Sequence, residues 1–169
     1  MSGTVAARTL DRDAVVAALR DVPDPEIPAI SVVDLGVIGG IEVEPDRLRV
    51  ELLPTFVGCP AIEPMRAAVE ARLRDLAPDR AIEVELSFAE PWTSDRITPH
   101  GRRRLVASGF GAPPAAGPVD RPIALDVAVP CPFCGSRRTV LENAFGPTPC
   151  RSIRYCTACR QPFEQFKTI

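Results

Sequence analysis

The sequence predicts an α+β protein, in which a small α-β-β-α-β sandwich domain is followed by a zinc-ribbon domain. Segments 47–52 and 81–88 alternate apolar and polar residues as strands do, whereas segment 60–76 repeats its apolar residues with helical spacing. Two Cys-x-x-Cys pairs stand near the C-terminal end with 21 residues between them, as in a four-cysteine ribbon. A stretch rich in glycine, proline and alanine separates the two patterns. The expected boundaries are 1–108 for the sandwich domain, 109–122 for the linker and 123–169 for the ribbon.

The 169-residue chain has an ordinary globular composition, with 46% hydrophobic and 25% charged residues. No apolar run reaches the roughly 18 residues that a membrane-spanning helix needs, and the first residues lack the apolar core of a signal peptide. We therefore expect a cytoplasmic protein with no membrane contact. In that compartment, two Cys-x-x-Cys pairs among six cysteines favour metal or redox chemistry over structural disulfides.

The net charge of −2 conceals two halves of opposite sign. Residues 1–95 carry 9 basic and 18 acidic side chains, whereas residues 96–169 carry 11 basic and 4 acidic ones. A basic half of this kind can meet nucleic acid, an acidic partner protein, or the acidic half of a second copy in a homodimer. The arginines are not interleaved with an aromatic platform on which bases could stack, so a nucleic-acid partner is not favoured.

The first predicted element is a helix over residues 9–20, whose start Thr9 or Asp11 can cap. Segment 21–28 then holds three prolines in eight residues. Proline lacks the N–H that helices and central strands need, so this segment is expected to be an extended loop with a stiff path.

A hairpin is predicted over residues 35–53. Residues 35–43 are apolar and β-branched, and Gly39-Gly40 indicates a bulge in this strand. After a short turn, segment 47–52 alternates apolar with charged residues and predicts a half-buried partner strand.

The next predicted elements are a helix over 60–76 and a strand over 81–88. Pro64 indicates that regular helix begins a few residues after Pro60. This helix can serve as the crossover between two strands of one sheet. Residues 98–108 add a short basic helix. The side chains expected to face inward from the last strand are Ile82, Val84, Leu86 and Phe88.

The ribbon is predicted to hold one structural zinc ion, with Cys131, Cys134, Cys156 and Cys159 as ligands. Zinc prefers four tetrahedral ligands, and a two-residue spacer lets both sulfurs of a pair face one ion. So short a segment buries little core, and the metal would supply folding free energy. The spacing leaves open an iron site in the same cysteines, or two disulfides.

Cys150 is a fifth cysteine in this domain, six residues before the second pair. It is either a small buried loop residue or a reactive thiol beside the zinc. In the second case, Arg151 and Arg154 would favour its thiolate.

Cys59 stands between a predicted strand and a predicted helix. A cysteine at a helix N-terminus meets free backbone N–H groups, which would stabilise its thiolate for metal or persulfide chemistry. Asp24, Glu26 and Asp34 can supply oxygen ligands or protons if the proline-rich loop folds over this thiol. The alternative is an inert core cysteine, with the acids as solvated loop or turn residues.

His100 is the only histidine and is expected in an exposed turn. One histidine cannot build a two-histidine iron site, and a catalytic triad would have to use this residue. The glycine-rich phosphate-binding motifs are absent from the sequence, so nucleotide binding is unsupported. The sequence therefore predicts no catalytic residues.

Two stretches closely resemble the SufT-like family of iron–sulfur cluster assembly proteins. They are Asp21-Val-Pro-Asp-Pro-Glu-Ile-Pro28, continuing to Val37, and Pro54-Thr-Phe-Val-Gly-Cys-Pro-Ala61. The run Glu90-Pro-Trp-Thr-Ser-Asp-Arg-Ile97 and the ending from Cys156 to Lys167 are similar to the PaaD (PaaJ) family. That family belongs to the bacterial phenylacetyl-CoA 1,2-epoxidase system of aerobic phenylacetate degradation. The resemblance covers nearly the whole chain.

This resemblance implies an accessory subunit. The system's oxygenase carries a carboxylate-bridged di-iron site, and its reductase carries flavin and a plant-type 2Fe–2S cluster. This chain has neither Glu-x-x-His pairs nor a C-x4-C-x2-C run for those centres. The resemblance marks Cys59 as the working thiol and Asp24 and Glu26 as its loop partners. They would hold iron or an iron–sulfur cluster transiently while the oxygenase or reductase matures, and zinc would keep the ribbon folded for docking. The alternatives are a structural subunit of the complex and a nucleic-acid-binding ribbon protein; a free-standing enzyme is not expected.

Overall fold

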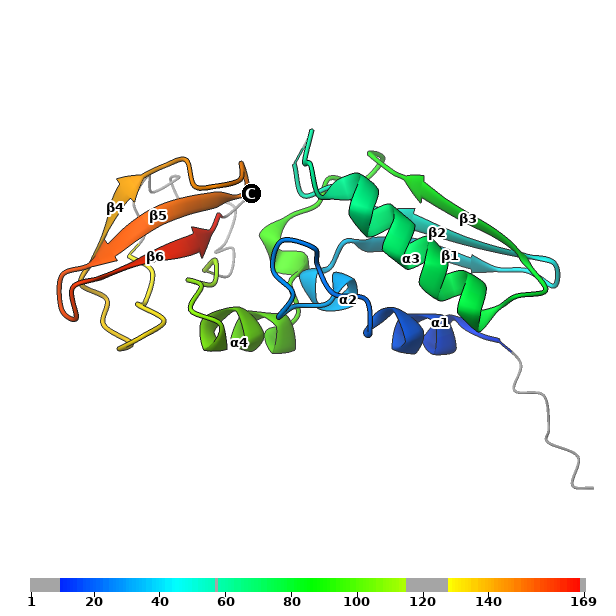
Figure 1. The fold of residues 1–169 in the computed structure, drawn as a ribbon, viewed down its shortest axis with the longest axis horizontal. Coiled ribbons are helices and arrows are strands. Elements are labelled where there is room, and N and C mark those ends of the chain that lie inside the picture. Colours follow the sequence, from blue (N-terminus) through cyan, green and yellow to red (C-terminus); the bar gives the residue numbers. More distant parts are fainter. Residues whose placement is uncertain (1–9, 57, 115–127, 168–169) are drawn as a thin grey trace, which may run out of the picture.

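The computed structural model describes residues 10–56, 58–114 and 128–167. Two three-stranded sheets, ordered β1-β2-β3 and β4-β5-β6, lie in two neighbouring lobes (Figure 1), which confirms the predicted α+β class. No helix of these residues is long and apolar enough to cross a membrane. The elements are α1 (Arg12–Leu19), α2 (Val32–Leu35), β1 (Ile38–Val43), β2 (Arg47–Leu52), α3 (Ile62–Leu76), β3 (Ala81–Leu86), the short 3-10 helix η1 (Ser94–Arg96), α4 (Pro99–Ala107), β4 (Thr139–Asn143), β5 (Arg151–Cys156) and β6 (Gln161–Phe166).

Helix α1 begins after Asp11, whose side chain accepts a hydrogen bond from the Ala14 amide at 2.8 Å. This confirms one of the two predicted caps; Thr9 lies outside the described residues. The proline-rich segment that follows is an extended loop, as predicted. An isolated bridge between Pro23 and Ser31 closes the base of this loop, which fixes its path beside the domain core.

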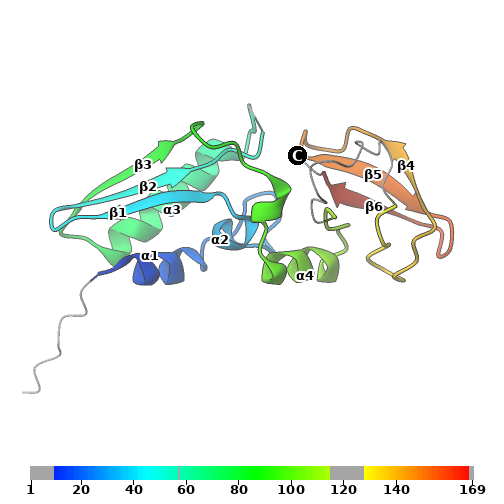
Figure 2. The same cartoon turned by 180° about the vertical axis from the view of Figure 1, so that it is seen from behind.

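The hairpin of β1 and β2 is antiparallel, and its register shifts between Ile38 and Ile41, which confirms the bulge at the two glycines. Strand β2 pairs with β3 in parallel, so α3 is the predicted crossover. Helix α3 lies across one face of this sheet, in front of it in Figure 1 and behind it in Figure 2. Leu48, Val50 and Leu52 of β2 are fully buried.

Two sequence-based predictions in this domain are wrong. Leu35 belongs to the short helix α2 rather than to a strand, because Ser31 caps that helix by accepting from the Asp34 amide at 3.0 Å. Gly36 ends the helix in the left-handed region (φ 75°), so β1 begins only at Ile38. Strand β3 ends at Leu86, and Phe88 is 65% exposed instead of facing inward.

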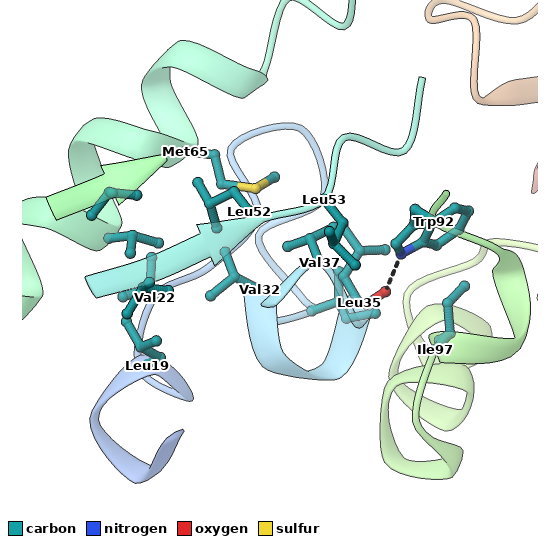
Figure 3. Close-up of a cluster of buried hydrophobic side chains, with 14 of the residues drawn as sticks. Leu19, Val22, Val32, Leu35, Val37, Leu52, Leu53, Met65, Trp92 and Ile97 are labelled. Carbon is teal, nitrogen blue, oxygen red and sulfur yellow. Dashed lines mark hydrogen bonds between the residues drawn. The ribbon is translucent and has the colours of Figure 1, made fainter. Parts of the chain in front are cut away.

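The segment from Trp92 through α4 packs against the outer side of α2. The Trp92 indole Nε1–H donates to the Leu35 carbonyl oxygen at 3.1 Å, the dashed line in Figure 3. The buried Asp34 carboxylate accepts from Thr98 at 2.6 Å and contacts His100 Nδ1 at 2.9 Å. His100 is exposed, as predicted, but it lies in helix α4 and contacts Asp34 instead of lying in a turn.

The ribbon packs directly against the N-terminal domain. Gly111, at the start of the predicted linker, forms a parallel bridge with Gln165 of β6. The rings of Trp92 and Phe166 lie 5.7 Å apart, and Cys150 and Phe166 belong to the same buried cluster as the core of the N-terminal domain. Residues 109–114 therefore contact both domains rather than serving only as a spacer; residues 115–127 are outside the described chain.

Candidate functional site

The four ribbon cysteines converge on one point at the end of the C-terminal sheet. Their sulfur atoms all lie within 4.8 Å of one another. The Sγ atoms of Cys131 and Cys159 are 3.6 Å apart, and those of Cys134 and Cys156 are 3.7 Å apart. Four sulfurs at about 2.3 Å from a tetrahedral ion would be about 3.8 Å apart. The spacing of the quartet is therefore close to that of a tetrahedral site for one metal ion.

Both cysteine pairs are built on the same turn. The Gly135 amide donates to the Cys131 carbonyl at 2.8 Å, and the Arg160 amide donates to the Cys156 carbonyl at the same distance. Both donor residues have left-handed backbones, with φ of 71° for Gly135 and 60° for Arg160. Left-handed backbone is costly for a residue other than glycine, so the turn at Arg160 is held by its surroundings.

The four thiols do not hold their protons equally. Backbone hydrogen bonds from Cys159 and Ala158 lower the pKa of Cys156 to about 7. Desolvation, together with hydrogen bonds to the other three sulfurs, raises the pKa of Cys159 to about 12. At neutral pH an entering cation must therefore displace protons from this quartet, so metal binding depends on pH.

Cys59 lies in the loop between β2 and α3. Its amide donates to the Phe56 carbonyl, and its own carbonyl accepts from the Ile62 amide, each at 3.2 Å. The preceding Gly58 has φ of 79°, and no atom lies within 4 Å of where its Cβ would be. Cys59 itself is half-buried.

The protonation state of Cys59 differs from the sequence-based expectation. Burial raises its pKa, and a hydrogen bond from the Ala61 amide only partly opposes this effect. The charges of Glu26, Cys150 and Asp24 raise the pKa further. The amide at the helix end stabilises the thiolate, as predicted, but burial and neighbouring negative groups outweigh it, so the net pKa of Cys59 is raised and the protonated thiol is favoured.

The proline-rich loop brings its two acids to the same place. Asp24 is 5% exposed, and its Oδ1 accepts from the amides of Glu26 at 2.9 Å and Ile27 at 2.7 Å. Burial is the main cause of its raised pKa. Asp34 is not part of this group, because Ser31, Thr98 and His100 already occupy its carboxylate. The charges of Asp24 and Glu26 act on the Cys59 thiol, and these three residues are called the Cys59 cluster below; their ligand atoms do not converge as those of the ribbon quartet do in the described part of the chain.

Cys150 lies at this cluster and not beside the ribbon quartet. It precedes β5, whereas Cys156 ends that strand, and six extended residues span about 20 Å. Cys150 is 4% exposed, and burial raises its pKa although Arg151 opposes the shift. The expectation of a thiolate beside the zinc is therefore wrong, and the simpler expectation of a buried residue is confirmed.

Two features near this cluster escaped the sequence analysis. Arg151 pairs with Glu26 at 3.3 Å, although 125 residues separate them in the chain. A cavity of about 320 Å³ also opens beside the Cys59 loop, with Phe56 43% and Phe88 65% exposed. A single sequence does not indicate that Glu26 and Arg151, 125 residues apart, form an ion pair. The residues that line the cavity are Pro54, Thr55, Phe56, Ser87, Phe88, Glu90, Pro91 and Trp92.

Two family models match separate parts of the chain. The iron–sulfur cluster assembly protein family matches residues 12–86, and the PaaD zinc beta ribbon domain matches residues 115–167. The fold also resembles the crystal structure of a domain of unknown function from Bacillus anthracis, with a TM-score of 0.51 and 24% identity over 55% of this chain and 89% of that one. By these matches, the chain joins a domain of the iron–sulfur cluster assembly protein family to a PaaD zinc beta ribbon domain.

The similarity extends to a protein with both parts. Over 155 residues, the chain is 34% identical to the putative PaaD component of the 1,2-phenylacetyl-CoA epoxidase of Escherichia coli K12, covering 90% of each. The chain belongs to this PaaD family of epoxidase components. It is also 27% identical over 95 residues to the Fe-S protein maturation auxiliary factor YitW of Bacillus subtilis 168, covering 56% of this chain and 92% of that protein.

Proposed function

We propose that this chain is a non-catalytic accessory subunit of the phenylacetyl-CoA 1,2-epoxidase of aerobic phenylacetate catabolism, and that it aids iron or iron–sulfur maturation of that complex. Family membership supports its place in the epoxidase system. The maturation role is carried by one observation. The charges of Glu26 and Asp24 act on the half-buried thiol of Cys59, within the domain that matches iron–sulfur assembly proteins.

The cluster has the chemistry of a transient iron site. A thiol that is protonated when free must lose its proton as a cation arrives, so binding is reversible and depends on pH. Glu26 and Asp24 offer oxygen ligands, which suit ferrous iron as well as sulfur does. The iron is cargo in this proposal, destined for the oxygenase or the reductase.

In the proposal, the ribbon quartet binds one zinc ion that keeps the C-terminal sheet folded. Four thiolates with tetrahedral spacing are typical of closed structural zinc sites, which have no open position for chemistry. The folded ribbon then serves as a docking module for a partner subunit. Its buried strand β5 supports this structural role, since Cys156 is fully buried there.

The basic residues of the C-terminal half do not favour nucleic acid as a partner. Arg151 and Arg154 are 8% and 4% exposed. Arg104 donates to the Ala29 carbonyl oxygen at 2.9 Å, and Arg96 donates to the Gly36 carbonyl oxygen at 3.0 Å. These four guanidinium groups make contacts within the fold, so they do not form a free phosphate-binding stripe.

The maturation role is tested by expressing the epoxidase subunits together with Cys59→Ala in this chain. We expect oxygenase or reductase that contains less iron and is less active, while the zinc content of this chain is unchanged. Asp46→Ala, in an exposed turn on another part of the same domain, is the matched control. A Cys59→Ala strain that makes fully metallated, fully active epoxidase would refute the proposal.

A stoichiometric structural subunit is the second candidate, and the exposed cavity beside Phe56 and Phe88 favours it. Apolar surface of this kind often lies at a protein–protein interface. Purification separates the two roles. A stable epoxidase complex that retains this chain indicates the structural role, whereas a transient association needed only during assembly indicates the maturation role.

A further inference from the structure

The cavity beside the Cys59 loop lies where two parallel strands end. Strand β2 ends at Leu52 and β3 at Leu86, and both strands run toward the ribbon (Figure 1). The Ser87 amide donates to the Leu52 carbonyl oxygen at 2.8 Å, which ties the two strand ends together. Residues 54–56 and 87–92 then form the walls of the cavity, whose volume is about 320 Å³. Small-ligand pockets begin at about 300 Å³, so this cavity suits one or two side chains rather than a whole cofactor.

The cavity is largely apolar, and its walls are held in place without a partner. Phe56 and Phe88 are both exposed, one on each wall. Pro54 and Pro91 fix the backbone of the two walls, because a proline ring restricts φ. Trp92 is buried, and its indole N–H is hydrogen-bonded to the backbone. A side chain that enters a preformed cavity of this kind requires little ordering of the protein.

The charge at the cavity is negative. Glu90 is the one charged side chain among the described residues that line it. Its side chain is 71% exposed, and Arg96 pairs with one of its two oxygens at 3.2 Å. Residues 1–95 as a whole carry 18 acidic and 9 basic side chains. A partner that complements this surface has a basic residue beside its apolar one.

The cavity and the Cys59 thiol belong to the same loop. The Cys59 amide donates to the Phe56 carbonyl oxygen at 3.2 Å, so the turn that carries the thiol begins in the cavity wall. Gly58, between them, has no atom within 4 Å of where its Cβ would be. A segment seated in the cavity is therefore adjacent to the backbone of Cys59.

We propose that the cavity docks the epoxidase subunit that receives the iron, through an apolar side chain of that subunit with a lysine or arginine next to it. The apolar side chain contacts Phe56 and Phe88, and the cation pairs with Glu90. This inference rests on the proposed function, which makes the partner a recipient of iron. The ribbon contributes to docking through the cavity wall, since the ring of Phe166 lies 5.7 Å from that of Trp92.

The test measures binding of two purified probes, the oxygenase and the reductase without their iron, to the zinc-loaded full-length chain. We expect one of them to bind the wild type. Phe88→Ser should weaken that binding at least about tenfold, because central aromatic side chains carry much of the binding energy. Glu90→Lys should weaken it at least about tenfold as well, since repulsion replaces attraction.

Val106→Ser is the matched control and should bind like the wild type. Val106 is 42% exposed, as Phe56 is at 43%, but it lies on α4 and outside the cavity. Zinc content and the urea unfolding midpoint verify that each variant is folded.

Several results would overturn the inference. They are no binding of either probe to the wild type, or binding that Phe88→Ser and Glu90→Lys leave unchanged. A change of oligomeric state in Phe88→Ser alone, measured by sedimentation, would assign the cavity to a second copy of this chain instead.

Cys59→Ala separates this inference from the function on which it rests. We expect that variant to bind the recipient like the wild type and still to yield epoxidase with less iron. Full iron content with Cys59→Ala, together with binding that depends on Phe88, would refute the maturation role while supporting the docking surface.

Discussion

Arg151 and Glu26 form an ion pair across the domain interface, with 3.3 Å between Nη2 and Oε2 and side chains that are 9% and 20% exposed. Arg151 also donates to Glu164 at 2.8 Å and lies over the Phe110 ring. Its guanidinium therefore joins the proline-rich loop, the residues after α4 and strand β6. This side chain thus helps to fix the position of the neighbouring Cys150, which also packs in the buried cluster.

Arg151→Ala should loosen the interface. Removing one partner from a largely buried ion pair leaves the other charge uncompensated, which typically lowers the free energy of unfolding by about 3–5 kcal/mol. Urea unfolding followed by Trp92 fluorescence measures this change, because the only tryptophan lies beside Phe166 of the ribbon. Arg66→Ala removes an exposed pair with Glu63 and should have little effect. Equal losses in the two variants would contradict the importance of the interface pair.

Removing metal should unfold the ribbon and disturb its partner domain. Structural zinc contributes about 10–16 kcal/mol of binding free energy in comparable sites, so the small C-terminal sheet should not persist without it. We expect one zinc per chain, a loss of strand signal on chelation, and a changed Trp92 emission as Phe166 moves away. Cys134→Ser should have the same effect before chelation. Unchanged circular dichroism in the metal-free protein would count against a structural role.

Gly36→Ala should destabilise the chain severely. The residue has φ of 75°, and an added Cβ would overlap the carbonyl oxygen of Arg96. Gly58→Ala is the matched control, since Gly58 has φ of 79° but open space around its Cβ position. Backbone strain of about 1–3 kcal/mol is common to both variants, so we expect a further loss of stability in Gly36→Ala that reports the steric overlap with Arg96. Chemical unfolding of both variants measures the difference. Similar denaturation midpoints would show that the backbone around Arg96 moves away from the added Cβ at little cost.

Acid should weaken the fold through Asp34. Burial opposes ionisation of this carboxyl, but hydrogen bonds from Thr98, His100 and Ser31 lower its pKa below the ordinary 3.8. A carboxyl whose folded pKa lies below its unfolded value stabilises the fold above the unfolded value, and this contribution is lost as the pH falls through the folded pKa.

Asp34→Asn should therefore destabilise the protein at neutral pH and reduce the loss of stability that the wild type shows below about pH 4. Unfolding midpoints measured from neutral to acidic pH test this expectation. Parallel profiles for the variant and the wild type would contradict it.

Much of the fold follows from local patterns. The alternation in β2, the bulge at Gly39-Gly40 and the crossover helix α3 are all present where the sequence predicts them. Helix α2 was missed because it is only four residues long, too short to show a helical period, and two of the four are β-branched valines. Its helical form depends on the cap at Ser31 and on a tertiary contact between Leu35 and Trp92, which no local pattern shows.

The candidate site was predicted in part. Spacing alone pointed to the ribbon quartet, and the resemblance to assembly proteins pointed to Cys59 and its acids. The place of Cys150 could not be predicted, because it depends on how the ribbon docks and on the Arg151–Glu26 pair. The pKa directions of the two interface thiols were wrong for the same reason, since burial at a domain contact outweighs the nearest arginine or helix end.

The bridge between Gly111 and Gln165, and the placement of Phe166 in the N-terminal core, tie the two halves of the polypeptide to each other. Shortening the chain to end at residue 114 would remove the aromatic neighbour of Trp92 and expose an apolar surface that favours aggregation. Exchanging one ribbon for another between relatives would require matched changes on both surfaces. We therefore expect the contacting surfaces of the two domains to evolve together.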